Sequence, residues 1–304
     1  MSNTKQITII GATGNLGVPT VKNLVNLGFS VKAIVRNEEK AIHCFGHSNN
    51  VELVKADLTD INTLKAALLK TEYLYLNLSS NTLDRTIEFA TEREGVANIL
   101  KAVDRENIKQ IICISGLGAF NNVHLPGNFE FIPNIIRKEG HKLIKESGIA
   151  YTILHCTNFI DNTIIYQRKG TYSIVGNPNG LSYFTNCYDY SVQLANAIGN
   201  RDTFFQEFAI QGEEALPHIE AAKKFLAIYA PTVKVRPLST GMLKILSLFI
   251  KEMKFIKYMA EYFSQMNEEF LAEESKTYKI LGAPQFGIEL YAEKLKTDNV
   301  YKQQ

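Results

Sequence analysis

In the first half of the chain, the spacing of apolar and polar residues alternates between the pattern of a strand and the pattern of a helix. Short, nearly continuous apolar runs predict buried strands, and apolar residues spaced three and four apart predict helices. Strands are expected at 6–10, 30–35, 51–54, 73–78, 110–115 and 151–155, and helices at 16–27, from about Asp60, at 85–103 and at 133–146. This alternation predicts an α/β fold with a parallel sheet that is covered on both faces.

The regular alternation of strand and helix patterns ends after residue 155. Residues 170–180 are rich in turn formers, 188–198 predict a helix, 207–210 predict one more strand, and the chain beyond 217 is mostly helical in pattern. No Ser/Gly/Pro linker or internal repeat divides the chain. We therefore expect a core at 1–155 and a mostly helical C-terminal substrate or lid lobe at 156–304, interleaved with the core through about 185–212.

Composition narrows the class of protein. The 304 residues carry a net charge of +2 and contain no dense Lys/Arg block, so nucleic acid is not an expected partner. The four cysteines are far apart, which predicts reduced thiols in a cytoplasmic protein and no metal site. The apolar run at 245–250 is too short to span a bilayer, and the N-terminal run is too short for a signal peptide.

A glycine-rich segment, GATGNLG at 11–17, joins the first predicted strand to the first predicted helix. Its glycines suit a Rossmann-type loop, in which they allow a tight turn, close approach of a pyrophosphate, and close packing of helix on strand. The N–H groups at the helix start would hold the phosphates. The context predicts a doubly wound, Rossmann-type sheet with a dinucleotide site, although a plain glycine-rich turn is the alternative. The predicted contacts are Gly11, Thr13, Gly14, Asn15, Leu16 and Gly17.

The end of the second predicted strand indicates which dinucleotide binds. A site for NAD(H) usually has Asp or Glu there to bind the ribose 2′-hydroxyl, whereas this chain has Arg36. A guanidinium pairs with a 2′-phosphate, so NADP(H) is predicted over NAD(H); an Arg that is only solvated is the alternative. Asp57 and Leu58 follow the third strand, near the expected adenine, although Asp57 would serve equally as a turn residue. Ser79 and Ser80 end the fourth strand and are expected to line the nicotinamide ribose.

Several motifs together resemble the NmrA-like atypical short-chain dehydrogenase/reductases. They are GATGNLG, the strand end AIVRN, VKADLTD, IICISGLG, and KLIKESGIAYTIL followed by Asn158 and Phe159. The resemblance is good over residues 5–165 and fainter to about residue 284. It implies a Rossmann fold with a C-terminal substrate lobe, NAD(P)(H) binding, and either reductase chemistry or non-catalytic redox sensing.

The resemblance also implies a catalytic Tyr-x-x-x-Lys pair on the helix after the fifth strand, but no Tyr stands four residues before a Lys there. In relatives that use a lysine alone, the matching position here is Arg137, which stays charged and is expected to anchor ribose or phosphate. His141, one turn later, is the candidate general acid, and a packing histidine is the alternative. Lys138 is a second candidate, and Ser115 is a candidate substrate-binding residue or a strand-end cap.

Residues 240–263 form a very apolar stretch with four lysines, which predicts an amphipathic helix. Such a helix could pack on the protein's own lobe, cover a substrate, form a homodimer face or lie on a membrane. Phe159, Tyr183, Phe184 and Tyr188 suit an apolar pocket for a small organic ligand.

Two functions remain open from the sequence. The intact glycine loop beside an aromatic C-terminal half favours an NADPH-dependent oxidoreductase that reduces a small carbonyl, enone or quinone-like substrate. The missing catalytic pair allows instead a non-catalytic NADP(H)-binding redox sensor or regulatory scaffold.

Overall fold

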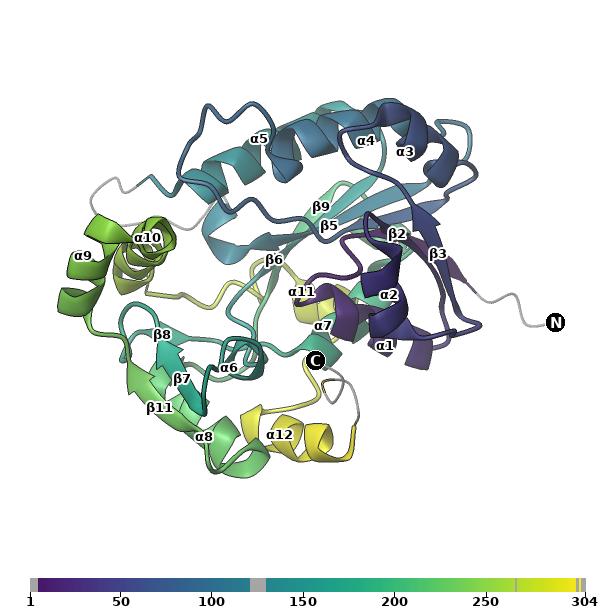
Figure 1. Ribbon diagram of the computed structural model, residues 1–304. Coiled ribbons are helices and arrows are strands. Elements are labelled where there is room, and N and C mark those ends of the chain that lie inside the picture. The colour runs from purple at the N-terminus through teal and green to yellow at the C-terminus, as the bar shows by residue number, and fades with distance from the viewer. Residues whose placement is uncertain (1–4, 121–129, 266, 299–300, 302–304) are drawn as a thin grey trace.

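A seven-stranded parallel sheet forms the centre of the protein in the computed structural model, which describes residues 5–120, 130–265, 267–298 and 301 (Figure 1). The strand order is β3-β2-β1-β4-β5-β6-β9. The strands are β1 (Gln6–Ile10), β2 (Ser30–Val35), β3 (Val51–Lys55), β4 (Tyr73–Leu76), β5 (Gln110–Gly116), β6 (Tyr151–Cys156) and β9 (Gln206–Ile210). The order reverses between β1 and β4, and such a switch point opens a ligand crevice at the carboxyl ends of the strands. The predicted fold class is confirmed.

Helices cover both faces of this sheet (Figure 1). One face carries α1 (Gly17–Asn26), α2 (Glu38–Phe45), α7 (Cys187–Ala197) and α11 (Thr277–Leu281). The other carries α3 (Ile61–Leu68), α4 (Val96–Ala102) and α5 (Ile132–Glu146). Burial on both faces explains why the inner strands β1, β4, β5 and β6 are buried at nearly every position, whereas the edge strand β3 is partly exposed.

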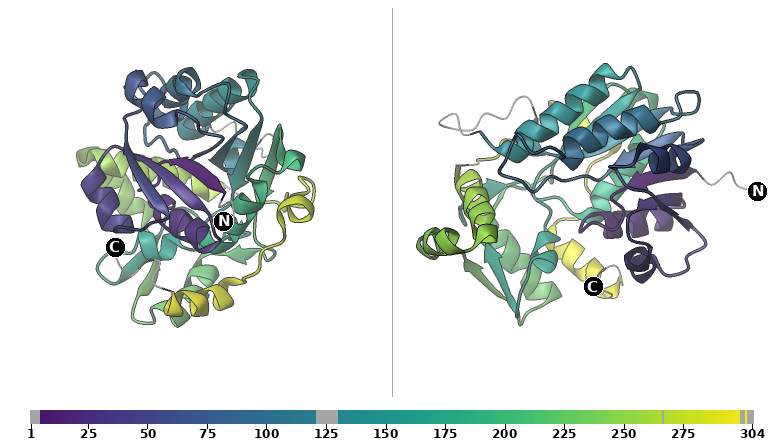
Figure 2. Two further views of the ribbon diagram at one scale, coloured as in Figure 1. Left: turned by 90° about the vertical axis from the view of Figure 1, so that its right-hand side faces the viewer. Right: turned by 45° about the horizontal axis from the view of Figure 1, so that its top comes forward.

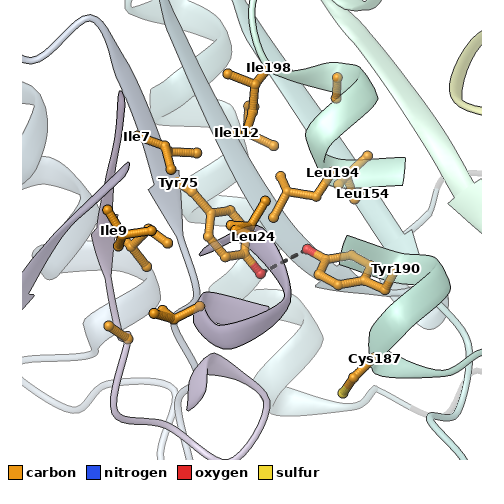
Figure 3. Packing of buried hydrophobic residues seen from close by; sticks show 14 of the residues in the cluster. Ile7, Ile9, Leu24, Tyr75, Ile112, Leu154, Cys187, Tyr190, Leu194 and Ile198 are labelled. Carbon is orange, nitrogen blue, oxygen red and sulfur yellow. Dashed lines mark hydrogen bonds between the residues drawn. The ribbon is translucent and has the colours of Figure 1, made fainter. Parts of the chain in front are cut away.

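A buried tyrosine pair joins the sheet to α7 in the first of these layers (Figure 3). The hydroxyls of Tyr75 on β4 and Tyr190 on α7 lie 2.8 Å apart. Both side chains are fully buried beside Ile7, Ile9 and Leu24. Because each hydroxyl is the partner of the other, two large side chains fill this core without an unsatisfied polar atom.

The predicted helix over 85–103 is wrong in its first half. Regular structure begins only with the π-helical turn η1 (Thr91–Gly95), which leads directly into α4. Before it, the Asp84 carboxylate accepts hydrogen bonds from the backbone N–H and hydroxyl of Thr86. The Arg93 guanidinium also donates to the carbonyls of Arg85 and Ile87. Side chains thus take the backbone hydrogen bonds that a helix would need.

The C-terminal lobe grows from two excursions of the chain. The first, between β6 and α7, forms α6 (Asn162–Ile165), β7 (Thr171–Ile174) and β8 (Leu181–Ser182). The second, after β9, forms β10 (Leu216–Pro217), α8 (His218–Tyr229), β11 (Lys234–Pro237), α9 (Thr240–Phe249), α10 (Lys251–Gln265) and α12 (Ile288–Thr297). The short sheets β7–β11 and β8–β10 join them, and the turn-rich pattern at 170–180 did not predict β7. The exact domain boundaries stay a prediction.

The stretch 240–263 is two helices rather than the single helix predicted. The chain turns at Ile250, and α9 and α10 pack side by side as a hairpin at the edge of the molecule (Figure 2). A stretch that is apolar on most sides buries more surface by folding back on itself than as one straight helix. None of the helices in the described residues is both long and apolar enough to cross a membrane.

Candidate functional site

The glycine loop leaves β1 and enters α1, and two of its glycines are required by the protein's own packing. Gly11 has a φ of +88°, and a Cβ there would lie 2.1 Å from the carbonyl oxygen of Asn77. A Cβ on Gly17 would lie 2.2 Å from the carbonyl oxygen of Gly11. Gly14 differs, because the nearest atom to its Cβ would be the Gly11 oxygen at 3.2 Å. The space beside Gly14 is therefore open enough for a ligand to approach the backbone.

The start of α1 suits a phosphate group. Among the described contacts, Leu16 provides no side-chain cap, and the first turn holds no acidic residue. The positive end of the helix dipole is left for an anion. Asn15 is exposed and Thr13 is half-buried, so the loop is accessible from the carboxyl edge of the sheet. These residues fit the pyrophosphate of a dinucleotide.

Arg36, Asp57 and Leu58 lie at the ends of the next two strands. Arg36 is exposed directly after β2. The Asp57 carboxylate accepts hydrogen bonds from the side chain and the backbone N–H of Thr59 at 2.7 and 2.8 Å. These bonds, and to a smaller extent the charge of Arg36, lower the pKa of Asp57. Asp57 thus acts as a turn residue here, while the Leu58 carbonyl accepts from Asn98 at 2.8 Å.

A buried ion pair ties Arg137 to the segment that follows β4. Glu92 is 5% exposed and accepts from Arg137 Nε at 2.6 Å and from the Ser80 backbone N–H at 2.7 Å. Arg137 Nη1 also donates to the amide oxygen of Asn134 at 2.9 Å. The structure therefore holds the guanidinium rigidly beside the end of β5. The sequence pattern did not single out Glu92, because its partner is 45 residues away.

A cavity of about 790 Å³ lies at the carboxyl ends of β4, β5 and β6, under the α9–α10 hairpin. Ser79, Ser80 and Arg137 line it. The contact of the two serines with the nicotinamide ribose stays a prediction. The core contributes residues 116–118 and 156–158 at the ends of β5 and β6, and residues 79–81 in the segment after β4. The hairpin contributes an apolar wall of Leu243, Leu246, Met253, Phe255, Ile256, Met259 and Phe263. The predicted role of this stretch as a substrate cover therefore agrees with its position.

Two tyrosines of α10 anchor the α9–α10 hairpin to the core. The Tyr262 ring stacks on Phe131 at a centroid distance of 3.9 Å, and its hydroxyl accepts from Asn134 Nδ2 at 3.0 Å. The Tyr258 hydroxyl accepts from the Ile132 backbone N–H at 2.9 Å. These contacts fix α10 against the start of α5, so the apolar wall has a defined place over the cavity.

Polar groups converge on the cavity from the lobe. The Tyr172 hydroxyl lies 3.0 Å from His218 Nε2, and burial lowers the pKa of His218 to about 4, which keeps its ring neutral at pH 7. Glu268 is buried, which raises its pKa, and accepts hydrogen bonds from Thr157 at 2.6 Å and from Ser182. These groups come from β7, α8 and the segment after α10. No motif in the sequence connects such distant positions.

The three predicted catalytic residues do not line this cavity. His141 is 7% exposed and packs edge-on against His155 at 5.6 Å between ring centroids. Burial, the neighbouring His155 and Arg137 place the pKa of His141 well below its usual range. Lys138 is exposed on the outer side of α5, and Ser115 is buried with its hydroxyl on the Gly116 carbonyl oxygen at 3.4 Å. We therefore do not propose these three as catalytic residues.

The aromatic pocket also differs from the prediction. Phe159, Tyr183, Phe184 and Tyr188 are absent from the described lining of the cavity. Phe159 is part of the hydrophobic core between the sheet and α1 and α7. Phe184 is part of the hydrophobic core of the C-terminal lobe. The aromatic side chains that do line the cavity are Phe131, Tyr166, Tyr172, Phe255, Tyr262 and Phe263.

Comparisons with known proteins agree with this geometry. The NAD(P)H azoreductase of Xenophilus azovorans is 23% identical over 71% of each chain. The quinone oxidoreductase QOR2 of Escherichia coli, solved with NADPH, has a TM-score of 0.68 at 21% identity, over 96% of this chain and 100% of that one. The triphenylmethane reductase of Citrobacter sp., solved with NADP(H), has a TM-score of 0.68 at 17% identity, over 95% of this chain and 99% of that one.

Several curated relatives match about half of this chain. The chain spans only about half the length of the first curated relatives that it matches, such as 40% of an anthocyanidin reductase from Arabidopsis thaliana at 28% identity over 41% of this chain. The profile of the NAD(P)H-binding family matches residues 11–180, more than half of the chain, and supports a nicotinamide dinucleotide as the cofactor. The family model thus agrees with the nicotinamide cofactor that the resemblance implies, and the solved structures agree with the Rossmann-type fold that it implies. The chain belongs to the NAD(P)H-binding family.

Proposed function

We propose that this protein is an NADPH-dependent reductase of a small, mostly apolar quinone-, enone- or carbonyl-type substrate. The observation that carries the proposal is the cavity of about 790 Å³, which joins the apolar wall of the hairpin to polar side chains of the core and the lobe and lies where the nicotinamide end of a dinucleotide would reach. Relatives named as azoreductase and quinone oxidoreductase support reduction over a purely regulatory role.

The dinucleotide is held by the core. The loop at 11–17 and the start of α1 bind the pyrophosphate, and Arg36 binds the 2′-phosphate of NADPH. Ser79 and Ser80, which line the cavity, hold the nicotinamide ribose. When bound, the reduced nicotinamide supplies a hydride to the substrate.

The substrate is held by the lobe. Leu243, Leu246 and Met259 exclude water from the cavity, which strengthens every polar contact inside it. In the tautomer of neutral His218 that carries its proton on Nε2, the ring donates to the Tyr172 oxygen at 3.0 Å. The single hydroxyl proton of Tyr172 then donates to the substrate oxygen. A quinone-like substrate needs no strong general acid, because its reduced oxygens take protons from solvent. This explains how the reaction proceeds without a Tyr-x-x-x-Lys pair.

The test is NADPH oxidation by the purified full chain against a panel of quinones, enones, aldehydes and azo dyes. We expect turnover with at least one quinone or enone, and a higher kcat/KM with NADPH than with NADH. Met259→Lys, which places a charge in the cavity wall, should lower kcat/KM at least about tenfold while NADPH affinity stays unchanged. Leu290→Lys on the exposed face of α12 is the matched control. Tight NADPH binding without turnover over the whole panel would instead indicate a sensor.

A further inference from the structure

The tip of the α9–α10 hairpin exposes a cluster of large apolar side chains. Ile245, Leu248, Phe249 and Ile250 are 62%, 74%, 82% and 41% exposed. The other large apolar side chains that are exposed in the described residues, Leu290 among them, are scattered singly over the surface. Single exposed apolar residues are ordinary, but a cluster indicates a surface that contacts an apolar partner.

Positive charge surrounds this cluster. Residues 240–263 contain four lysines and two glutamates. Lys244 lies one residue before the cluster and Lys254 four residues after it, and both are exposed. An apolar tip flanked by lysines is complementary to a membrane whose headgroups are anionic, because the side chains reach the acyl boundary while the ammonium groups stay among the phosphates.

The size of the cluster argues for lipid rather than for a second copy of the chain. The exposed fractions of the four side chains amount to about 2.6 fully exposed ones, so the cluster offers roughly 400–650 Å² even if each is as large as an aromatic side chain of about 150–250 Å². A stable dimer buries about 800 Å² on each partner. A membrane requires no matching surface, and a few apolar side chains with nearby lysines are enough for reversible binding.

We propose that the hairpin tip docks on the surface of an anionic membrane through the side chains of Ile245, Leu248, Phe249 and Ile250. The opposite side of the same hairpin lines the cavity through Leu246, Met253 and Ile256. Docking would therefore bring the apolar wall of the cavity to the lipid surface. The docking itself does not depend on which reaction the cavity supports.

The experiment is co-sedimentation of the full chain with vesicles of pure phosphatidylcholine, or of phosphatidylcholine in which part is replaced by phosphatidylserine. We expect binding to the vesicles that contain phosphatidylserine and weaker binding at high salt, since the lysines contribute. Leu248→Ser combined with Phe249→Ser should weaken vesicle binding at least about tenfold, because two apolar side chains no longer enter the interface. Leu290→Ser, which changes a leucine that is 64% exposed on α12, is the matched control and should bind like the wild type.

Three results would overturn the proposal. The first is a wild-type chain that does not bind vesicles containing phosphatidylserine. The second is a Leu290→Ser chain that loses as much binding as the tip variant. The third is a wild-type dimer that the tip substitutions dissociate, because a second copy would then cover the tip. Residues 248 and 249 are outside the described cavity lining, so NADPH oxidation with a water-soluble quinone should be unchanged in the tip variant, which separates failure of docking from failure of the proposed reaction.

Discussion

Substitution of Gly14 separates dinucleotide binding from folding. In Gly14→Val the added Cβ would lie 3.2 Å from the Gly11 oxygen and 3.6 Å from Asn77 Nδ2, so small shifts accommodate it and the fold should survive. The γ-methyl groups would fill the open space that the pyrophosphate needs. A hydrogen bond to a charged group contributes about 1.5–3 kcal/mol, so the loss of two such bonds corresponds to about 3–6 kcal/mol. NADPH affinity should therefore fall by roughly 10²–10⁴-fold.

Isothermal calorimetry with NADPH and thermal unfolding measure these two effects on the same protein. Gly17→Ala is the contrasting variant, because its Cβ would lie 2.2 Å from the Gly11 oxygen and 2.7 Å from the Ala12 oxygen. Backbone atoms must move there, so the free energy of unfolding should fall by about 1–3 kcal/mol. A folded Gly14→Val protein that binds NADPH as tightly as the wild type would refute the proposed pyrophosphate site.

Three further outcomes follow from the same contacts. Arg36→Asp should weaken NADPH binding by about 2–4 kcal/mol and NADH binding far less, because a charge-assisted pair becomes a repulsion; equal weakening by calorimetry would exclude Arg36 from the 2′-phosphate. Burial alone would raise the pKa of Glu207, but hydrogen bonds from His155 and Lys145 lower it from 4.5 to about 2. The ionised Glu207 carboxylate therefore stabilises the fold above pH 4.5, and this contribution is lost as the pH falls toward 2. In urea unfolding across this range, the free energy of unfolding should fall less for Glu207→Gln than for the wild type. His141→Asn should keep turnover within a few-fold and leave the pH profile unchanged, since His141 lies outside the cavity lining; a fall of about 10²–10⁴-fold would restore it as the general acid.

Local patterns in the sequence were enough to predict the core of the fold. The inner strands β1, β4, β5 and β6 are mostly apolar and are buried at nearly every position, because both faces of the sheet are covered, and this pattern is visible in the sequence. The start of α3 was also predictable, since Asp60 accepts from the backbone N–H groups of Asn62 and Thr63 as an N-cap does. The glycine loop was equally visible, because its glycines recur at every third position, although the structure alone shows that Asn77 limits the space beside Gly11.

Only the tertiary structure decided where the substrate side of the site lies. Arg137 is paired with Glu92, and Tyr172 with His218, across 45 and 46 residues of sequence. Contacts over such distances leave no period in the sequence, because they depend on how the lobe folds back over the strand ends. The turn at Ile250 is of the same kind: the pattern at 240–263 fits one amphipathic helix, and packing of α9 against α10 converts it into a hairpin. The sequence by itself determined the nucleotide-binding half, whereas the cavity depends on long-range contacts that only the folded chain brings together.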